Sequence, residues 1–326
     1  MNNNSWLKTG FVTELVPEGI NLTEEINRMK HEKNAVIMAH YYQTADIQNI
    51  ADCIGDSLAL AQMATKTDAS IIVLAGVYFM GETAKILSPH RKVIVPDANA
   101  GCSLADSCCS DEFSRFIAEH PNHKVVTYVN TTAAVKALSD LVVTSTNAVK
   151  IVQSIPIDQP VIFGPDRNLG NYINGLTGRN MLLWNGACHV HEKFSVEKIL
   201  ALKQLYPNAE VLAHPECKQP VLMISDFVGS TAALLAYSQQ STAKEFIVAT
   251  EAGILHEMQR HSPQKNFIPA PPNDSTCACN DCEYMKLITL EKIYLSLKYE
   301  FPLVEVDETI RQKALIPIER MLKLSK

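Results

Sequence analysis

One pattern of residues occurs three times in the chain, and this internal repeat limits the fold more than any other feature of the sequence. A short apolar run ends near His40, another near Tyr128 and a third near His214, and these residues are 88 and 86 positions apart. The same two intervals separate further matched positions, namely Ser57, Ser145 and Thr231, then Gly76, Gly164 and Thr250, and then Ile94, Leu182 and Ile268. Self-similarity at a fixed spacing indicates one structural unit that is copied along the chain.

Each copy has the pattern of an α/β unit with the order strand, helix, strand, helix, strand. Short continuous apolar runs such as residues 70–76 are typical of strands buried on both faces, and residues 57–66 have helical apolar spacing. Parallel strands joined by right-handed helical crossovers form three layers. We therefore predict an α/β protein with three homologous three-layer αβα units, whose parallel sheets are arranged around a pseudo-threefold axis. The expected boundaries are a helical lead-in at 1–33, repeats at 34–118, 119–205 and 206–300, and a helical tail at 301–326.

The composition excludes several classes of protein. The chain has 35 acidic and 29 basic residues among 326, and this net charge of -6 argues against nucleic acid as the main partner, because phosphate binding needs a basic surface. No membrane partner is expected, since no segment approaches 18 uninterrupted apolar residues and the first residues lack the apolar run of a signal peptide. We therefore expect a cytoplasmic protein. In that reducing compartment, nine cysteines indicate metal binding or catalysis rather than a disulfide framework.

A loop with cysteine follows the third predicted strand of every repeat. These loops supply Cys102, Cys188 and Cys282, with Cys279 as the alternative in the third loop. If the three units pack around one axis, the loops present three thiolates, which suit an iron–sulfur cluster with one open iron or a zinc ion with one open position. Cysteine is also common as a small apolar core residue, which is the expected role of Cys53 in an apparently helical segment. Cys217 lies near the predicted site, and its role stays open.

Polar residues occupy equivalent positions at the carboxyl ends of the first strands, where parallel α/β sheets bind their ligands. The three pairs are His40 with Tyr42, Tyr128 with Asn130, and His214 with Glu216. Residues two positions apart in an extended strand point to the same side, so each pair is expected to face the same cavity. A His–Glu pair can move protons, and a tyrosine can donate a hydrogen bond to a developing oxyanion.

Hydroxyl residues stand at the starts of three predicted helices. Ser57, Ser145 and Thr231 are expected there, where the backbone N–H groups and the helix dipole favour anions. Serine and threonine at such positions more commonly act only as helix caps. His191, three residues after Cys188, is expected to face the same cavity.

Several longer motifs resemble the quinolinate synthase family, the A protein of bacterial NAD biosynthesis. They occur in order over residues 34–300 and include MAHYYQ, GDSLALAQMA, DANAGCSLAD, YVNTTAAVKALSD, TSTNAVKIV, ACHVH, HPEC and CEYMK. The resemblance implies three homologous α/β domains with a [4Fe–4S] cluster at their junction, held by Cys102, Cys188 and Cys282. It also implies an enzyme that condenses iminosuccinate with dihydroxyacetone phosphate to give quinolinate, phosphate and water.

The resemblance also implies the substrate-binding positions and a functional link to the aspartate oxidase or dehydrogenase that supplies iminosuccinate. The implied positions are His40, Tyr42, Ser57, Tyr128, Asn130, Ser145, His191, His214, Glu216, Ser230 and Thr231. The sequence departs from the family pattern where valines in the segment SDLVVTSTN replace cysteines of many relatives. Some relatives carry a longer run of cysteines near the last ligand, of which only Cys279 and Cys282 keep the spacing here.

The implied reaction agrees with the interpretation of the residues, because both substrates are anionic and the pyridine ring forms without net electron transfer. We expect the open iron to act as a Lewis acid and Tyr42, His214 and Glu216 to be the catalytic residues that move protons. Two other hypotheses belong to different classes. One is a cluster-bearing sensor or ligand-binding protein without catalysis, and the other is a hydrolase with a zinc ion bound by three cysteines.

Overall fold

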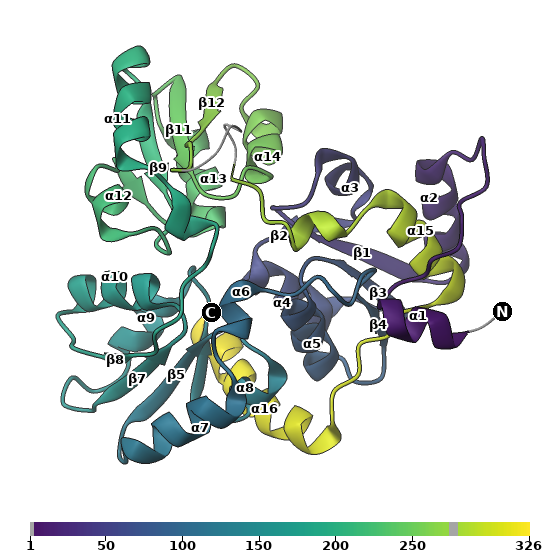
Figure 1. The fold of residues 1–326 in the computed structure, drawn as a ribbon, viewed down its shortest axis with the longest axis horizontal. Helices are drawn as coiled ribbons and strands as arrows, with labels where there is room; N and C mark the ends of the chain where they lie inside the picture. Colours follow the sequence, from purple (N-terminus) through teal and green to yellow (C-terminus); the bar gives the residue numbers. More distant parts are fainter. Residues whose placement is uncertain (1–2, 274–279) are drawn as a thin grey trace. The chain divides into compact units, whose positions relative to one another are not determined.

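The computed structural model describes residues 3–273 and 280–326 and divides the chain into two compact units (Figure 1). Unit 1 consists of Met1–Cys102 and Glu283–Leu315, and unit 2 consists of Ser103–Cys282 and Ile316–Lys326. Within the described ranges, no helix has both the length and the apolar character that crossing a membrane requires.

Three parallel sheets of four strands each form the framework, one in unit 1 and two in unit 2. The sheet of unit 1 has the order β2-β1-β3-β4, with β1 (Ala35–His40), β2 (Cys53–Gly55), β3 (Ile71–Ala75) and β4 (Lys92–Ile94). The first sheet of unit 2 has the order β6-β5-β7-β8, with β5 (Lys124–Tyr128), β6 (Leu141–Val143), β7 (Val161–Gly164) and β8 (Leu182–Leu183). The second has the order β10-β9-β11-β12, with β9 (Glu210–Ala213), β10 (Phe227–Val228), β11 (Glu245–Ala249) and β12 (Asn266–Pro269). The repeated strand order confirms the predicted α/β class.

Helices join successive strands, as right-handed crossovers in parallel sheets require (Figure 1). Unit 1 contains α1 (Asn3–Thr9), α2 (Leu22–Glu32), α3 (Ala45–Ile50), α4 (Ser57–Lys66), α5 (Tyr78–Leu87), the 3₁₀ helix η2 (Met285–Leu287) and α15 (Leu290–Tyr299). Unit 2 contains α6 (Ser103–Asp106), α7 (Ser110–Glu119), α8 (Ala133–Lys136), α9 (Ala148–Gln153), α10 (Arg167–Thr177), the 3₁₀ helix η1 (His191–Lys193), α11 (Val196–Leu205), α12 (Gln219–Met223), α13 (Thr231–Gln240) and α14 (Ile254–His261). The last helix, α16 (Glu308–Leu324), contributes residues to both units.

In every sheet, an aspartate at the equivalent position forms a hydrogen bond to the neighbouring strand. The repeat is therefore visible in single hydrogen bonds. Asp52, Asp140 and Asp226 each directly precede the short edge strand and are again 88 and 86 residues apart. The Oδ2 atom of each accepts a backbone N–H from the neighbouring strand, donated by Ile37 at 2.8 Å, Val125 at 2.9 Å and Val211 at 2.7 Å. These edge strands have two or three residues each, and the sequence pattern did not predict them.

Cys53 shows the consequence of the missed edge strand. The sequence placed it in a helical segment, but it is the first residue of β2 and is half-buried. Three residues are too few for a hydrophobic period. The strand forms because β1 supplies its hydrogen-bond partners, and the Asp52 carboxylate, which accepts the Ile37 N–H of β1, fixes the start of the strand beside it. Burial, with a smaller contribution from Asp52, raises the pKa of the Cys53 thiol to about 11, so the side chain is neutral as expected for a packing residue.

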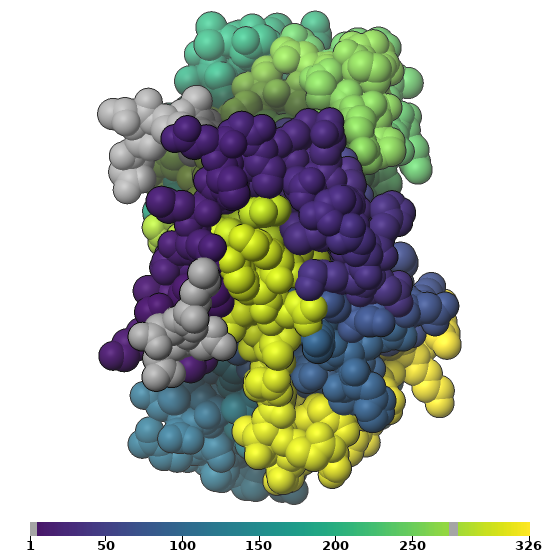
Figure 2. Space-filling view, turned by 90° about the vertical axis from the view of Figure 1, so that its right-hand side faces the viewer, coloured from purple at the N-terminus to yellow at the C-terminus, as the bar shows by residue number. Residues whose placement is uncertain are grey.

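The C-terminal segment of unit 1 packs against residues from near the start of the chain. Helix α15 lies beside α2, and the rings of Trp6 and Tyr299 have centroids 4.9 Å apart. Figure 2 shows the yellow-green residues of this segment bordered by purple residues of the first helices. Residues 283–300, which the sequence analysis assigned to the third repeat, are thus part of unit 1. The repeat boundaries themselves stay predictions.

Candidate active site

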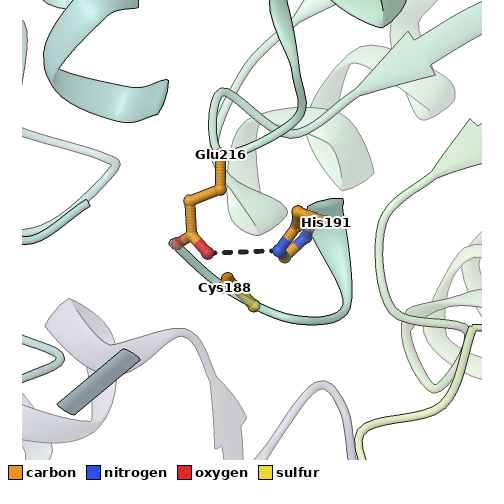
Figure 3. Close-up of side chains that lie close together, drawn as sticks. All are labelled: Cys188, His191 and Glu216. Atoms are coloured by element: carbon orange, nitrogen blue, oxygen red, sulfur yellow. Dashed lines mark ion pairs between the residues drawn. The ribbon is translucent and has the colours of Figure 1, made fainter. Parts of the chain in front are cut away.

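A buried carboxylate, Glu216, is the centre of a polar cluster in unit 2 (Figure 3). The hydroxyl of Tyr128 donates a hydrogen bond to its Oε1 atom at 2.5 Å. The Nδ1 atom of His191 lies 3.1 Å from its Oε2 atom, and the Nδ1 atom of His214 lies 3.7 Å from Oε1. All four side chains are almost completely buried. The structure therefore brings together four of the residues that the sequence proposed, two from each sheet of unit 2.

A tight turn after β9 orients His214 and Glu216. The Cys217 N–H donates to the His214 carbonyl at 2.9 Å, and the Glu216 N–H donates to His214 Nδ1 at 3.3 Å. The prediction that this pair shares one face of an extended strand is wrong, because β9 ends at Ala213 and the pair lies in the turn. The Nδ1 atom of His214 thus has a hydrogen-bond partner within the turn itself.

The environment of Glu216 determines its charge. Burial by itself raises the pKa of the carboxyl group, but His214, His191 and the Tyr128 hydroxyl outweigh this effect and hold the pKa below its usual value. The nearby Asp166 shows the opposite result, because its burial and the negative charge of Glu216 raise its pKa, although three backbone N–H groups act against this. Glu216 is therefore the carboxylate of the cluster that stays ionised.

Cys188, His191 and Glu216 together form a set of metal-ligand type. Their ligand atoms all lie within 4.8 Å of one another, and Figure 3 shows the three side chains close together. His191 Nδ1 is buried and makes no hydrogen bond within the described part of the chain, although it contacts the Glu216 carboxylate. Its other nitrogen, Nε2, lies 3.0 Å from the hydroxyl of Thr250.

Comparison with known proteins identifies the family of the chain. The family described as quinolinate synthetase A protein matches residues 24–323. The chain belongs to this family. Similar curated proteins are the quinolinate synthases of Synechococcus sp., Thermosynechococcus vestitus and Chloroherpeton thalassium, which are 58%, 57% and 56% identical to it. The matched regions cover 93%, 95% and 94% of this chain and 95%, 97% and 95% of the three relatives.

The turn after β1 in unit 1 has the same hydrogen bonds as the turn after β9. The Gln43 N–H donates to the His40 carbonyl at 3.0 Å, and the Tyr42 N–H donates to His40 Nδ1 at 3.2 Å. The rings of His40 and Tyr42 meet edge to face with centroids 4.5 Å apart. Two repeats of this quinolinate synthetase A family member thus orient a histidine by the same two backbone hydrogen bonds.

Two of the three predicted hydroxyl residues lie at helix starts, but neither is the cap. Ser57 and Thr231 are the first residues of α4 and α13. The caps are the preceding residues, Asp56, which accepts the Ala59 N–H at 2.9 Å, and Ser230, which accepts the Ala233 N–H at 3.3 Å. The capping role is therefore filled by the neighbouring residue in both cases.

Ser145 is an exception to the predicted pattern. Helix α9 begins only at Ala148, so the expectation of a helix start at Ser145 is wrong. The reason is local, because the Asn147 side chain accepts the Thr144 N–H at 2.7 Å and closes a turn in place of the first helical residues. Thr146 in this turn donates to the Ser230 hydroxyl at 2.9 Å, which links the turn to the start of α13.

The remaining predicted residues belong to different parts of the molecule. Cys102 lies in unit 1, whereas Cys188 and Cys282 lie in unit 2, and all three are half-buried. Asn130 is a half-buried residue shortly after β5, and Cys279 lies outside the described residues. The meeting of the three cysteines stays a prediction.

Cys217 can now be assigned to the core. Its side chain is fully buried in an apolar cluster with Ala213, Ile247 and Ala249, and its thiol donates to the Ala249 carbonyl at 3.3 Å. Burial, together with the adjacent Glu216 charge, keeps the pKa of the thiol well above its usual value. A thiol in such surroundings is inert, so Cys217 is a packing residue.

Sequence reasoning missed two buried acids that lie next to the predicted cysteine ligands. Asp166 and Glu251 are inaccessible to solvent, and each follows the end of a central strand by two residues. They accept the backbone N–H groups of Cys188 and Cys282. The sequence did contain one indication of these residues, namely an acidic side chain two positions after each buried strand. The two acids are 85 residues apart, however, and therefore do not match the repeat interval of 86.

Proposed function

We propose that the chain catalyses the condensation of iminosuccinate with dihydroxyacetone phosphate to quinolinate, phosphate and water. The observation that carries this proposal is the buried Glu216 cluster in a chain of the quinolinate synthetase A family. Three ionisable or hydrogen-bonding groups around one carboxylate exceed what ligand binding alone requires. This favours an enzyme over a sensor with the same cofactor.

The proposed cofactor is a [4Fe–4S] cluster held by Cys102, Cys188 and Cys282. The residues of unit 2 fit such a group, because Cys188 is half-buried and its sulfur lies close to a carboxylate and to an imidazole nitrogen, all of them atoms that can bind a metal. A cluster bound by three cysteines supplies a Lewis acid at its open iron. The rival zinc hypothesis uses the same three residues and is distinguished by metal analysis.

Proton transfer is assigned to the residues around Glu216. Its low pKa keeps the carboxylate ionised at neutral pH, so Glu216 Oε can accept a proton from a substrate carbon or nitrogen. Tyr128 holds its proton on Oη and donates it toward Glu216, and the same hydroxyl can turn to a substrate oxyanion. His214, in its protonated form, can act as an acid. Tyr42 in unit 1 is the further proposed proton donor.

Binding of the two anionic substrates is assigned to the predicted polar positions. Ser57 and Thr231 lie at the first residues of helices, where N–H groups favour phosphate and carboxylate, and their hydroxyls are not used as the helix caps. The other proposed contacts are His40, Tyr42, Tyr128, Asn130, Ser145, His191, His214, Glu216 and Ser230. Supply of iminosuccinate by an aspartate oxidase or dehydrogenase, and a location in the cytoplasm, belong to the same proposal.

The decisive experiment uses protein purified without oxygen. Incubation with dihydroxyacetone phosphate and freshly generated iminosuccinate should yield quinolinate, measured by liquid chromatography, with one phosphate released per product. Analysis should find four irons and four sulfides per chain, and the protein should be brown and bleach in air. Zinc in a colourless protein would support the hydrolase hypothesis. A full cluster without quinolinate formation would support the sensor.

A further inference from the structure

The two buried acids missed by the sequence analysis occupy the same place in their respective sheets. Asp166 follows β7, Glu251 follows β11, and neither side chain is accessible to solvent. In both carboxylates, the two oxygens accept hydrogen bonds from different segments. One oxygen binds the start of the next helix, and the other binds the backbone of a cysteine.

In the first sheet of unit 2, Asp166 joins helix α10 to the loop that contains Cys188. Its Oδ1 atom accepts the N–H groups of Asn168 at 2.6 Å and Leu169 at 3.0 Å, which caps the helix. Its Oδ2 atom accepts the Cys188 N–H at 2.9 Å. A second bond between the same segments runs from the Arg167 N–H to the Gly186 carbonyl at 2.8 Å.

In the second sheet, Glu251 makes the corresponding contacts. Its Oε1 atom accepts the Cys282 N–H at 3.1 Å, and its Oε2 atom accepts the Gly253 N–H at 2.7 Å next to the start of α14. The Asn280 side chain, two residues before Cys282, donates to the Val190 carbonyl at 3.0 Å and so connects the two cysteine loops.

The Cys188 loop is also packed too closely to shift easily. A Cβ atom at Gly186 would collide with the Ser107 hydroxyl and would lie 3.1 Å from Pro165 Cβ. His189, the residue after Cys188, has its Nδ1 atom 2.7 Å from the Ser103 hydroxyl. The buried hydrogen bond from the Cys188 N–H to Asp166 adds a further constraint to this crowded loop.

We infer that Asp166 and Glu251 are positioning residues that hold the backbones of Cys188 and Cys282 in place before any metal group binds. Ordering a loop costs conformational entropy, and a tether that orders it in the folded protein removes this cost from the binding step. The inference rests on the proposed function for the identity of the group, but the tethers themselves are a property of unit 2 alone.

The variant Asp166→Asn separates the helix-capping role of this side chain from its hydrogen bond to Cys188. Asparagine is a good helix cap, so its oxygen can still serve α10, while its NH₂ group faces the Cys188 N–H and cannot accept a hydrogen bond from it. Glu251→Gln is the corresponding change for Cys282. Ser195→Ala is the matched control, because it removes the buried cap of α11, whose hydroxyl accepts the Lys198 N–H at 3.2 Å, without contacting either cysteine.

The first measurement is the anaerobic loss of iron to a chelator. Residues that orient metal ligands typically change metal affinity by about 10- to 100-fold when mutated, so we expect iron release at least about tenfold faster from Asp166→Asn and Glu251→Gln. Ser195→Ala should release iron at the rate of the unmodified protein. Equal rates for all four proteins would overturn the inference.

The second measurement needs no cluster and identifies which loop has loosened. In apoprotein treated with iodoacetamide, Asp166→Asn should be alkylated several-fold faster at Cys188 but not at Cys282, and Glu251→Gln should show the reverse. The exposed Cys109 serves as the internal reference for reagent activity. Equal acceleration at both sites would indicate general loosening of unit 2 and would contradict specific tethers.

A third measurement on the unmodified apoprotein covers the case that a variant does not fold. If the tethers exist, the amide protons of Cys188 and Cys282 should exchange with deuterium at least about a hundredfold slower than in an unstructured peptide. Exchange at the unstructured rate would overturn the inference. Unmodified protein without iron would instead overturn the proposed cluster, and the exchange rates would still decide whether the tethers exist.

Discussion

The turn His40–Gln43 in unit 1 and the turn His214–Cys217 in unit 2 have the same backbone and different chemistry. In both, the fourth residue donates its N–H to the carbonyl of the histidine, and the third donates its N–H to Nδ1. The third residue is Tyr42 in one turn and Glu216 in the other. The two turns therefore orient an imidazole by the same hydrogen bonds, whereas the third residue supplies a hydroxyl in unit 1 and a carboxylate in unit 2.

The surroundings of the two turns explain why the carboxylate occurs in unit 2. Glu216 is buried among Tyr128, His191 and His214, which together compensate the cost of burying its charge. Tyr42 is only half-buried, and as a neutral side chain it needs no compensating charge. The same turn can therefore hold a carboxylate in one repeat and a phenol in another, because the surrounding side chains differ.

The largest effect is expected from removing the charge that distinguishes the two turns. Glu216→Gln keeps the shape of the side chain but can no longer accept a proton, and general acid–base groups typically contribute about 10²- to 10⁴-fold to rate. We expect kcat to fall at least about a hundredfold while iron content and visible absorbance stay unchanged. Glu192→Gln is the control, since Glu192 pairs with Arg167 and Lys218. Turnover above a tenth of the unmodified rate would exclude Glu216 from the reaction.

A smaller effect is expected from removing one partner of the carboxylate. The Tyr128 hydroxyl lowers the pKa of Glu216, so Tyr128→Phe should raise that pKa and make the site lose its ionised carboxylate at a higher pH. The acid limb of the profile of kcat/KM against pH should therefore move to higher pH, with a fall of about tenfold at the optimum. An acid limb that stays in place, or moves to lower pH, would contradict the assigned hydrogen bond.

The repeat and the α/β class could be predicted because both depend on local sequence. Buried parallel strands require apolar runs, and equal spacing of their ends follows from copying one unit. The strand-end rule likewise identified Tyr128, His214 and Glu216, and the spacing of three residues from Cys188 indicated His191, all of which the structure brings together. These residues follow directly from the order of strands and loops.

The features that were missed depend on contacts between distant segments. The edge strands of two or three residues form because they pair with a neighbouring strand, and the aspartate before each of them accepts an N–H from that neighbouring strand. The late start of α9 depends on one asparagine side chain, Asn147. Asp166 resembles an ordinary helix cap in the sequence, and its second task exists only because the chain returns with Cys188 22 residues later.

The fourth residues of the two turns allow a comparison of stability rather than activity. Gln43 donates to the Met285 carbonyl at 3.1 Å, whereas Cys217 donates its thiol to the Ala249 carbonyl. Replacing either by alanine removes a buried side chain and a hydrogen bond, at a cost of about 1–3 kcal/mol, which corresponds to about 2–4 °C in Tm for each kcal/mol.

The cysteine variant of this pair also tests the assignment of the metal ligands. Cys217→Ala should keep its iron, whereas Cys188→Ala should lose the cluster altogether. Iron and sulfide analysis of the two anaerobic proteins measures this difference. Retained iron in Cys188→Ala, or a lost cluster in Cys217→Ala, would reverse the assignment of ligand and packing residue.

The smallest effect is expected for a carboxylate of unit 1 that is partly exposed, in contrast to the buried Glu216. Glu300 pairs with Lys33 at 2.8 Å and with Lys92 at 2.5 Å, and hydrogen bonds from these two lysines lower its pKa. A lowered pKa in the folded state means that the stabilisation is complete above the unfolded value near 4.5 and is lost as the pH falls below it. Because surface ion pairs contribute only about 0–1 kcal/mol, Glu300→Gln should lower Tm by no more than a few degrees at pH 7 and by less at pH 3. A larger fall in Tm at pH 3 than at pH 7 would contradict the lowered pKa assigned to Glu300.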